Sequence, residues 1–408
     1  MSIHQEWIEE GEKYARAFND ILKYAQIHGW ENWKGPDPVD TRTHLAQEVL
    51  SLLRDANKQD KVEQFRYLFP PSYAPFTQFL EASGQRIEQI NFIDSDRAVF
   101  FADPSKGKRI PYLLDNDTVA PLETSITSIG KSPRNNVFAI ANDASVITTQ
   151  NWQGSQIKYF PRTRSLSADI SQIIPSNDGM SVFLLSPQGI FVLSQDQDIR
   201  IFPDDNASDD IFLSMENIAL SPDNNFLAIG DQDLQHTIIG KDGSIIATIG
   251  PQSSYPHFCL FSKDSTQFLS NSCHFYNGVT IAVDTLNLPG LTLEPFKESD
   301  SYKLIDDNMR VYQGVSTSSF YILGDAYGWI KAITKDGKLL WEHFIGSTIT
   351  GMAVSDDETT LLVGSYSGML HKLILDKGHR DNHTIGTGNN FEVFRLLIWQ
   401  NEERVWKW

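Results

Sequence analysis

The stretch LSPDNNFLAIGDQD, Leu220 to Asp233, decides the fold of this chain. It places a polar turn, SPDNN, between two short strand-like runs, MENIAL before it and FLAIG after it. Apolar runs of this length on either side of Pro, Asp and Asn predict two strands joined by a hairpin. Because variants of the phrase recur along most of the chain, we interpret it as one copy of a repeated unit.

Seven segments share the pattern, and their turns are spaced as in a repeat protein. Asp178 lies 45 residues before Asp223, Asp223 lies 41 before Asp264, and Ser318 lies 39 before Asp357. The 54 residues from Asp264 to Ser318 predict an insertion in that unit. The copies read IEQINFIDSDRAVFFAD from Ile87, ITSIGKSPRNNVFAIANDASV from Ile126, ISQIIPSNDGMSVFLLSPQGI from Ile170, MENIALSPDNNFLAIGDQDL from Met215, PHFCLFSKDSTQFLSNS from Pro256, VYQGVSTSSFYILGDAYGWI from Val311 and ITGMAVSDDETTLLVGSYSGML from Ile349.

Each unit continues with two more strand-like runs. The third run follows a turn with Gly, as in GWIKAI after Tyr327 and GMLHKLI after Ser367. The fourth follows an Asp-Gly pair, as in KDGSIIATIG from Lys241 and KDGKLLWEHFIG from Lys335. Asp-Gly is typical of a tight type I′ hairpin turn, which needs positive φ. Repeats of roughly 40 to 50 residues with four strands predict propeller blades.

We therefore predict a mainly β protein, a seven-bladed β-propeller of four-stranded blades over residues 86–408, with an N-terminal α-helical segment over residues 1–85. Six or eight blades remain open, because the first copy and the tail match weakly. SPDNNFLAIGD resembles the phrase of WD-repeat and related bacterial propellers, and DGKLLWEHFIG resembles a quinoprotein-type propeller strand. The chain departs from the WD pattern, since no Gly-His or Trp-Asp pair recurs between the units. The resemblance implies the fold far more than the function.

The first 85 residues have helical periodicity instead. Asp40 or Thr41 is expected to cap a second helix, and shorter helices are expected over residues 62–68 and 77–81. We expect the apolar face of the first helix to pack on the side or bottom of the propeller. That face is formed by residues at steps of three and four: Trp7, Tyr14, Phe18, Ile21, Leu22 and Ala25.

Composition limits the classes of partner. The 408 residues carry a net charge of −18, which disfavours nucleic acid and anionic membranes and favours basic partners. The first thirty residues lack the apolar region of a secretory signal, and two cysteines are few for a disulfide-stapled protein. We expect a cytoplasmic protein that is monomeric on its own. The aromatic tail over residues 389–408 is interpreted as closing strands of the ring, with an exposed docking patch as the alternative.

Catalytic motifs are mostly absent. GSYSG, Gly364 to Gly368, has Tyr where a nucleophile elbow has Ser, and GKS at Gly130 lacks the upstream glycine of a phosphate loop. Quinone enzymes are expected to use adjacent cysteines, which this chain lacks, so the resemblance implies no cofactor. His379 and His383 in GHRDNH could hold a metal, but two histidines on one loop are weak evidence.

Four side chains of zinc-ligand type lie close in sequence: His257, Cys259, Cys273 and His274. If Phe261 pairs with Gln267 across the SKDST turn, Cys259 lies opposite Leu269. Cys273 is then about 13 Å farther along the strand, too far for a shared ion or a disulfide. We therefore expect no metal site here and interpret both cysteines as buried core residues.

Acidic and tyrosine residues cluster in loops that a propeller places on one rim. The loop between strands two and three of each blade opens on the same rim as the connection between blades. Such a rim could dock a basic protein, although charged loops are also typical of a plain solvated surface. The predicted partner-binding residues are Asp204, Asp205, Asp209, Asp210, Asp231, Asp233, Asp325, Tyr327 and Tyr366.

Three functions remain open at this point. The favoured hypothesis is a non-catalytic binding protein for one basic partner, in its sharpest form an immunity protein that inhibits a bacterial toxin enzyme. The second is a propeller enzyme with a metal or small-molecule site in the central channel. The third is an assembly scaffold that uses the helices of residues 1–85 to join a larger complex.

Overall fold

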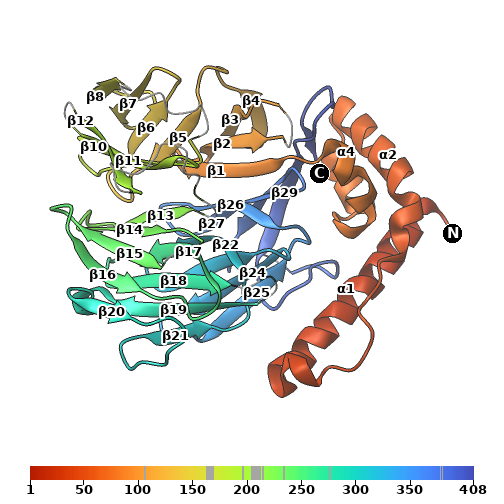
Figure 1. Ribbon diagram of the computed structural model, residues 1–408. Coiled ribbons are helices and arrows are strands. Elements are labelled where there is room, and N and C mark those ends of the chain that lie inside the picture. The colour runs from red at the N-terminus through yellow and green to blue at the C-terminus, as the bar shows by residue number, and fades with distance from the viewer. Residues whose placement is uncertain are drawn as a thin grey trace.

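The computed structural model spans residues 1–408 and describes all of them except 105–106, 162–169, 195–196, 204–212, 214–215, 233–234, 274, 276, 377 and 379. Seven sheets are arranged around a common axis as the blades of a propeller, with the helices on one side (Figure 1). The mainly β class, the seven blades and the helical extension are thus confirmed. In each blade the first four strands in space follow chain order as an antiparallel meander.

The first three blades are β1 (Arg86–Phe92), β2 (Arg97–Asp103), β3 (Ile110–Asp115) and β4 (Thr118–Pro121); β5 (Ser128–Lys131), β6 (Val137–Ala141), β7 (Ser145–Gln150) and β8 (Gln156–Pro161); and β9 (Gln172–Pro175), β10 (Ser181–Ser186), β11 (Gly189–Ser194) and β12 (Gln197–Phe202). Blade 4 is β13 (Asn217–Leu220), β14 (Phe226–Gly230), β15 (His236–Gly240), β16 (Ile245–Ile249) and the added β20 (Leu291–Leu293).

Blades 5 and 6 are β17 (Tyr255–Phe261), β18 (Gln267–Cys273), β19 (Gly278–Asp284) and β21 (Lys303–Asp306); and β22 (Val311–Ser316), β23 (Phe320–Asp325), β24 (Trp329–Thr334) and β25 (Leu339–Phe344). Blade 7 is β26 (Ile349–Val354), β27 (Thr360–Ser365), β28 (Met369–Ile374), β29 (Phe391–Leu397) and β30 (Trp406–Lys407).

A serine–aspartate pair explains why the opening phrase forms a hairpin turn. The Ser221 hydroxyl donates to the Asp223 carboxylate (2.6 Å) and accepts the Phe226 backbone N–H (2.9 Å). These two hydrogen bonds satisfy polar groups of the turn locally and fix where the second strand begins. The same serine-to-aspartate bond occurs in three other blades, at Ser176, Ser262 and Ser355.

The Asp-Gly hairpins form as predicted, but the predicted turn type is wrong. Only the glycines have positive φ, 83° at Gly243 and 86° at Gly337, whereas a type I′ turn needs two such residues. In the first hairpin the Gly243 N–H donates to Gly240 O (2.9 Å), and the register shifts nearby, between Ile238 and Ile239. Each turn is therefore a three-residue loop with a glycine bulge.

The predicted insertion lies between the third and fourth strands of blade 5. It forms a short 3-10 turn, η4 (Thr285–Asn287), and then β20, which pairs in parallel with β16 of blade 4. The Gly250 N–H donates to Leu293 O (2.9 Å) at the end of this pairing. The insertion therefore fastens blade 5 to its neighbour along the outer edge of the ring.

The N-terminal segment folds as α1 (Ile3–His28), α2 (Ala46–Lys58), α3 (Val62–Leu68) and α4 (Leu80–Ser83), with 3-10 turns η1 (Trp30–Asn32), η2 (Thr41–Leu45) and η3 (Ala74–Phe79). Asp40 caps η2 by accepting the Arg42 N–H (3.1 Å), as predicted. The helix predicted over residues 77–81 is instead η3 followed by α4. Among the described residues, no helix combines the length and apolar character needed to cross a membrane.

The aromatic tail is buried, which excludes the exposed docking patch proposed for it. It supplies β29 and β30, the outer strands of blade 7, and Figure 1 shows β29 beside the N-terminal helices. Trp408 is fully buried, and its indole N–H donates to Phe69 O (2.7 Å). The core shared by helices and tail comprises Trp7, Leu45, Val49, Leu50, Leu53, Phe65, Phe69, Phe76, Met369, Leu397, Trp399, Trp406 and Trp408.

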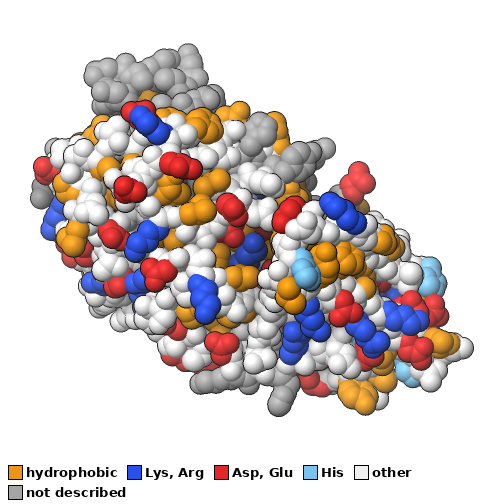
Figure 2. Space-filling model, turned by 90° about the horizontal axis from the view of Figure 1, so that it is seen from below, with side chains coloured by type: hydrophobic (Ala, Val, Ile, Leu, Met, Phe, Trp, Pro, Cys, Tyr) orange, Lys and Arg blue, Asp and Glu red, His pale blue; other side chains and the backbone are white. Residues whose placement is uncertain are grey.

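The acidic side chains that give the net charge of −18 are not in excess on every face of the molecule. Figure 2 shows one side of the molecule on which acidic and basic side chains are interspersed, with hydrophobic side chains between them. Ion pairs such as Lys335 with Asp264 (2.5 Å) and Lys263 with Glu358 (2.5 Å) join different blades. An electrostatic docking surface must therefore be sought at a particular end of the ring.

We expect Gly130→Ala to destabilise the propeller strongly. A Cβ atom at Gly130 would lie 1.8 Å from the carbonyl oxygen of Ile173 in the next blade, so the inner strands would have to separate. The expected loss is about 3 kcal/mol of unfolding free energy, measured by chemical denaturation. Gly240→Ala is the control, because its Cβ would meet side-chain atoms of Asp242 and Ile246 at 3.2 Å and its nearest backbone atom, Ser244 O, only at 3.7 Å. Equal stability of the two variants would contradict the close approach of blades 2 and 3.

Candidate functional site

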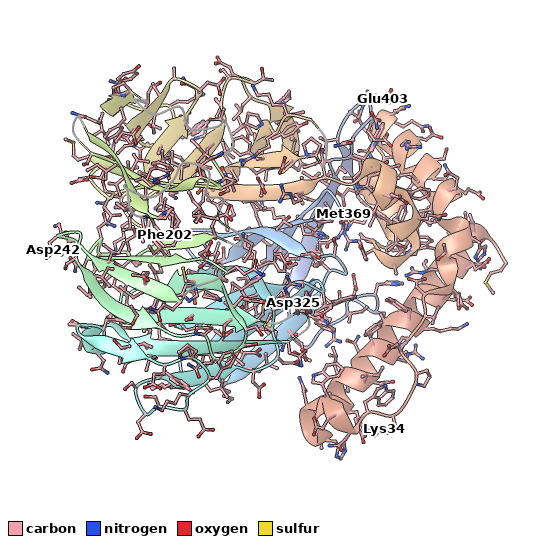
Figure 3. All side chains as sticks on the ribbon, viewed as in Figure 1. Lys34, Phe202, Asp242, Asp325, Met369 and Glu403 are labelled. Atoms are coloured by element: carbon pink, nitrogen blue, oxygen red, sulfur yellow. The ribbon has the colours of Figure 1, made fainter. Side chains whose placement is uncertain are left out.

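The two ends of the ring differ in their loops. The loops between second and third strands and the connections between blades lie at one end, here called the mouth. The turns between first and second strands and between third and fourth strands lie at the other end, here called the turn end. Figure 3 shows Asp242, in the turn after β15, far from Asp325, which ends β23 close to the helices.

The turn end is bridged by contacts between turns. The Asn177 N–H donates to the Asn224 side chain of the next blade (2.6 Å). Arg134 donates to Lys263 O (3.4 Å), which links blade 2 to blade 5, two blades that are not neighbours. Because bonds of this kind span the ring opening, the mouth is the end at which a partner or ligand has room to enter.

The mouth contains a cavity of about 1070 Å³. Its walls come from the helical segment, from blades 1, 2, 3 and 7, and from the connections that precede the first strands. This volume is at the upper end of the range for small-molecule pockets. It is also large enough to receive several side chains from a loop of a partner protein.

Two ion pairs of blade 1 lie in the cavity wall. Arg86 pairs with Asp103, and Arg109 pairs with Glu88 at 2.9 Å. The Arg109 guanidinium also lies 4.7 Å from the ring centre of Phe101. Its Nη1 atom donates to Ile170 O (2.8 Å), which precedes the first strand of blade 3. Burial raises the pKa of Glu88, although the charges of Arg109 and Arg86 act in the opposite direction.

Gln89 explains why charged residues face the cavity here. It has a positive φ of 51°, and the pairing of β1 with β2 shifts register beside it. Its side chain accepts the Ser128 hydroxyl (2.9 Å) and donates to Ser171 O (2.6 Å), so it joins blades 1, 2 and 3. The bulge thus positions Glu88 at the mouth and binds the first three inner strands together.

Some buried polar atoms of the cavity wall have no hydrogen-bond partner among the described residues. These are the Arg109 Nε atom and the Thr127 hydroxyl, and Thr127 is only 6% exposed. Unpaired buried polar groups are costly and uncommon in native proteins. A ligand or a partner side chain that carries an acceptor would satisfy them.

Five of the predicted docking residues lie outside the described residues: Asp204, Asp205, Asp209, Asp210 and Asp233. Asp231 and Asp325 lie at the mouth and are buried, at 7% and 4% exposure. Tyr327 and Tyr366 lie in the corresponding loops of blades 6 and 7 and are exposed, at 46% and 57%, and Tyr366 lines the cavity. Their role in docking stays a prediction.

The Asp325 carboxylate has an evident structural role. It accepts the backbone N–H groups of Tyr327 (2.8 Å) and Trp329 (2.9 Å), which shapes the turn that presents the tyrosine. Burial raises the pKa of Asp325 to about 6, although these hydrogen bonds act in the opposite direction. Asp325 therefore stabilises the loop at the mouth and is too buried to present its charge directly to a partner.

Sequence reasoning missed the charged pairs of blade 1, because they lie in the weakest copy of the repeat. A signal for the cavity exists in the aligned phrases. A polar pair lies at the start of the inner strand in three copies and inside β1 in the first copy: Thr127-Ser128, Ser171-Gln172, Glu216-Asn217 and Glu88-Gln89. The first member of each pair lines the cavity. A polar residue repeated at one position of the inner strand therefore indicates the wall of the mouth.

The register predicted for the cysteine hairpin is wrong by one residue. Phe261 pairs with Phe268, and Cys259 pairs with Ser270, so the strand is displaced by one position from the prediction. Both Cys259 and Cys273 are free and buried, and burial raises the pKa of each thiol. His257 is held by a bond from its Nδ1 to Val311 O (2.6 Å). His274 and His379 lie outside the described residues. In the part of the chain that the structure describes, no three His, Cys, Asp or Glu side chains form a metal cluster.

A scan against protein-family models finds no model that matches this chain, and a search of curated proteins returns no significant match. The structure itself shows the seven-bladed propeller, and nothing assigns it to the WD-repeat or quinoprotein type. The site therefore has to be interpreted from its own residues.

Replacing Asp325 with Asn is expected to change how stability depends on pH. The folded-state pKa of about 6 exceeds the ordinary value of 3.8, so the folded protein holds this proton more tightly. The wild type therefore loses stability as pH rises from about 4 to 6, and Asp325→Asn does not. The stability of the variant relative to wild type should rise by roughly 2 kcal/mol between pH 4.5 and 6.5, then stay constant.

Asp223→Asn is the matched control. Partial burial raises the pKa of Asp223, but hydrogen bonds from Ser221 and Asn225 lower it overall, below 3.8. The stability difference between this variant and wild type should therefore be flat above pH 5. If the stability of both variants relative to wild type changed with pH in the same way, the raised pKa of the buried Asp325 would be contradicted.

Proposed function

We propose that this protein is a non-catalytic binding module that docks one protein partner at the mouth of the ring. The observation that carries the proposal is a row of exposed aromatic side chains in the loops of three consecutive blades. Phe275, Tyr327 and Tyr366 lie between the second and third strands of blades 5, 6 and 7, and are 65%, 46% and 57% exposed. Aromatic anchors on rigid loops are typical of protein-binding surfaces, because they bury large area at low entropic cost.

The partner that fits best is basic. The net charge of −18 would speed the approach of a positively charged protein and would repel nucleic acid. Inside the cavity Arg86 and Arg109 already pair with carboxylates, so attraction comes from the wider acidic surface. In its sharpest form the proposal makes the protein an immunity protein that blocks a toxin enzyme, since enzymes that act on nucleic acid present basic surfaces.

A second candidate function is small-molecule binding in the same cavity, with or without catalysis. The unpartnered Arg109 Nε and Thr127 hydroxyl favour it, because they offer hydrogen bonds deep in a cavity of about 1070 Å³. The scaffold hypothesis is disfavoured by packing. The apolar faces of the N-terminal helices are already covered by blade 7, where Trp7 contacts Trp408 with ring centres 6.1 Å apart.

Removing the aromatic row should weaken partner binding without unfolding the ring. The variant Phe275→Ala, Tyr327→Ala, Tyr366→Ala is compared with wild type in capture from the native host, and then with the identified partner by calorimetry. We expect at least tenfold weaker binding, since central aromatic anchors dominate binding free energy. Tyr159→Ala is the control, because Tyr159 is 49% exposed on β8, the outer strand of blade 2, and does not line the cavity.

Varying the salt concentration distinguishes binding of a basic partner from docking of any protein at the mouth. Affinity for a basic partner should fall as NaCl rises, because screening weakens the approach of opposite charges. Salt-independent binding that still needs the three aromatic residues would refute the basic partner and retain docking at the mouth. Equal binding by wild type and both variants would refute docking at the mouth.

A further inference from the structure

A second cavity, of about 290 Å³, lies where the N-terminal helices meet blades 6 and 7. One wall comes from α1 and from the segment before η3, and the other comes from the end of β25, the loop after β28 and β29. It is separate from the mouth in all but one lining residue, Tyr73. Nothing in the docking proposal uses this cavity.

Two guanidinium groups share one buried carboxylate at its wall. Glu392 accepts bonds from Arg395 Nη2 (3.1 Å) and from His371 Nδ1 (2.9 Å), and Arg66 Nη2 lies 3.4 Å from it. Despite burial, these neighbours hold the pKa of Glu392 well below its usual range, so it is an anion that is already fully engaged. The balance of Arg66, Arg395 and Glu392 leaves one positive charge beside the cavity.

The other charged residues of the wall are Arg42 and Asp381, and the Asp381 carboxylate offsets this excess. Arg42 is neutralised by Asp40 (2.6 Å), and both side chains are 2% exposed. Asp381 is exposed, and its carboxylate already accepts the His383 N–H (2.9 Å) and the Thr384 hydroxyl (2.8 Å). The interior of the cavity is therefore richer in donors than in free acceptors.

Unpartnered nitrogen atoms also line the cavity. Arg395 is 6% exposed, and its Nη1 atom has no hydrogen-bond partner among the described residues. The buried Nδ1 atom of His383 has none either. A buried guanidinium nitrogen without a partner is expensive, and its N–H groups can only be satisfied by an acceptor. The cavity is larger than a single water molecule needs.

We propose that this cavity binds a small oxyanion, either inorganic phosphate or a small carboxylate. Arg395 Nη1 donates to it with the charge of its guanidinium, and His383 donates to it as the tautomer protonated at Nδ1. The ligand sits between the helices and blades 6 and 7, so its binding fastens the helical segment to the ring. The inference is independent of docking at the mouth, and neither result bears on the other.

The test uses the full chain and three probes, inorganic phosphate, sulfate and acetate, each against NaCl of equal ionic strength. A ligand that binds only the folded state raises Tm, and we expect a rise of about 3 °C at 20 mM of the preferred anion. Calorimetry then gives the affinity and the stoichiometry. A response to phosphate and sulfate identifies a tetrahedral oxyanion, and a response to acetate alone identifies a carboxylate.

Two variants locate the site. Arg395→Lys keeps the charge but loses the Nη1 donor, and His383→Phe keeps a ring without the Nδ1 donor; each should weaken binding at least fivefold. If Arg395→Lys does not fold, His383→Phe decides alone. Arg97→Lys and His28→Phe are the controls, because both residues are exposed and neither lines the cavity, and they should bind as wild type. No anion-specific rise in Tm, or binding that ignores Arg395 and His383, would overturn the proposal.

Discussion

The ring is closed by packing between blades 1 and 7, and each of these blades is built, in the described residues, from strands that are consecutive in the chain. Ile87 is fully buried there, and its carbonyl oxygen accepts the Thr350 hydroxyl (2.8 Å). A Cβ at Gly364 would lie 2.3 Å from the same oxygen, so only glycine permits this approach. Arg86 and Glu88 flank Ile87, and the charged wall of the mouth therefore exists only while the first inner strand is held against the last blade.

The closure is supported from outside by the helices. Met369 and Trp399 of blade 7 share a core with Trp7 and Phe76 of the helical segment (Figure 3 labels Met369). This core protects the outer edge of the blade, which an open sheet would otherwise expose. The same arrangement creates the smaller cavity beside Arg395. One packing arrangement thus closes the ring, covers its last blade and forms two polar cavities.

Most of the fold could be predicted from the sequence, because local signals repeat. The Ser-Pro-Asp turn at Ser221 and the Asp-Gly turns carry their own hydrogen bonds, so each hairpin is determined within its copy. The site could not be predicted in the same way. The pairing of Arg109 with Glu88 depends on a bulge at Gln89, and the contact of the tail with the helices joins residues at opposite ends of the chain. Such contacts have no local pattern.

The most direct test of the closure is hydrogen exchange in Gly364→Ala compared with wild type. We expect the amides of β1 and β26 to lose protection together, because an added methyl group pushes Ile87 away from blade 7. The amides of β13, across the ring in blade 4, should keep their protection. Unchanged protection of β1 in the variant would contradict closure by this contact and would remove the basis for a mouth built on blade 1.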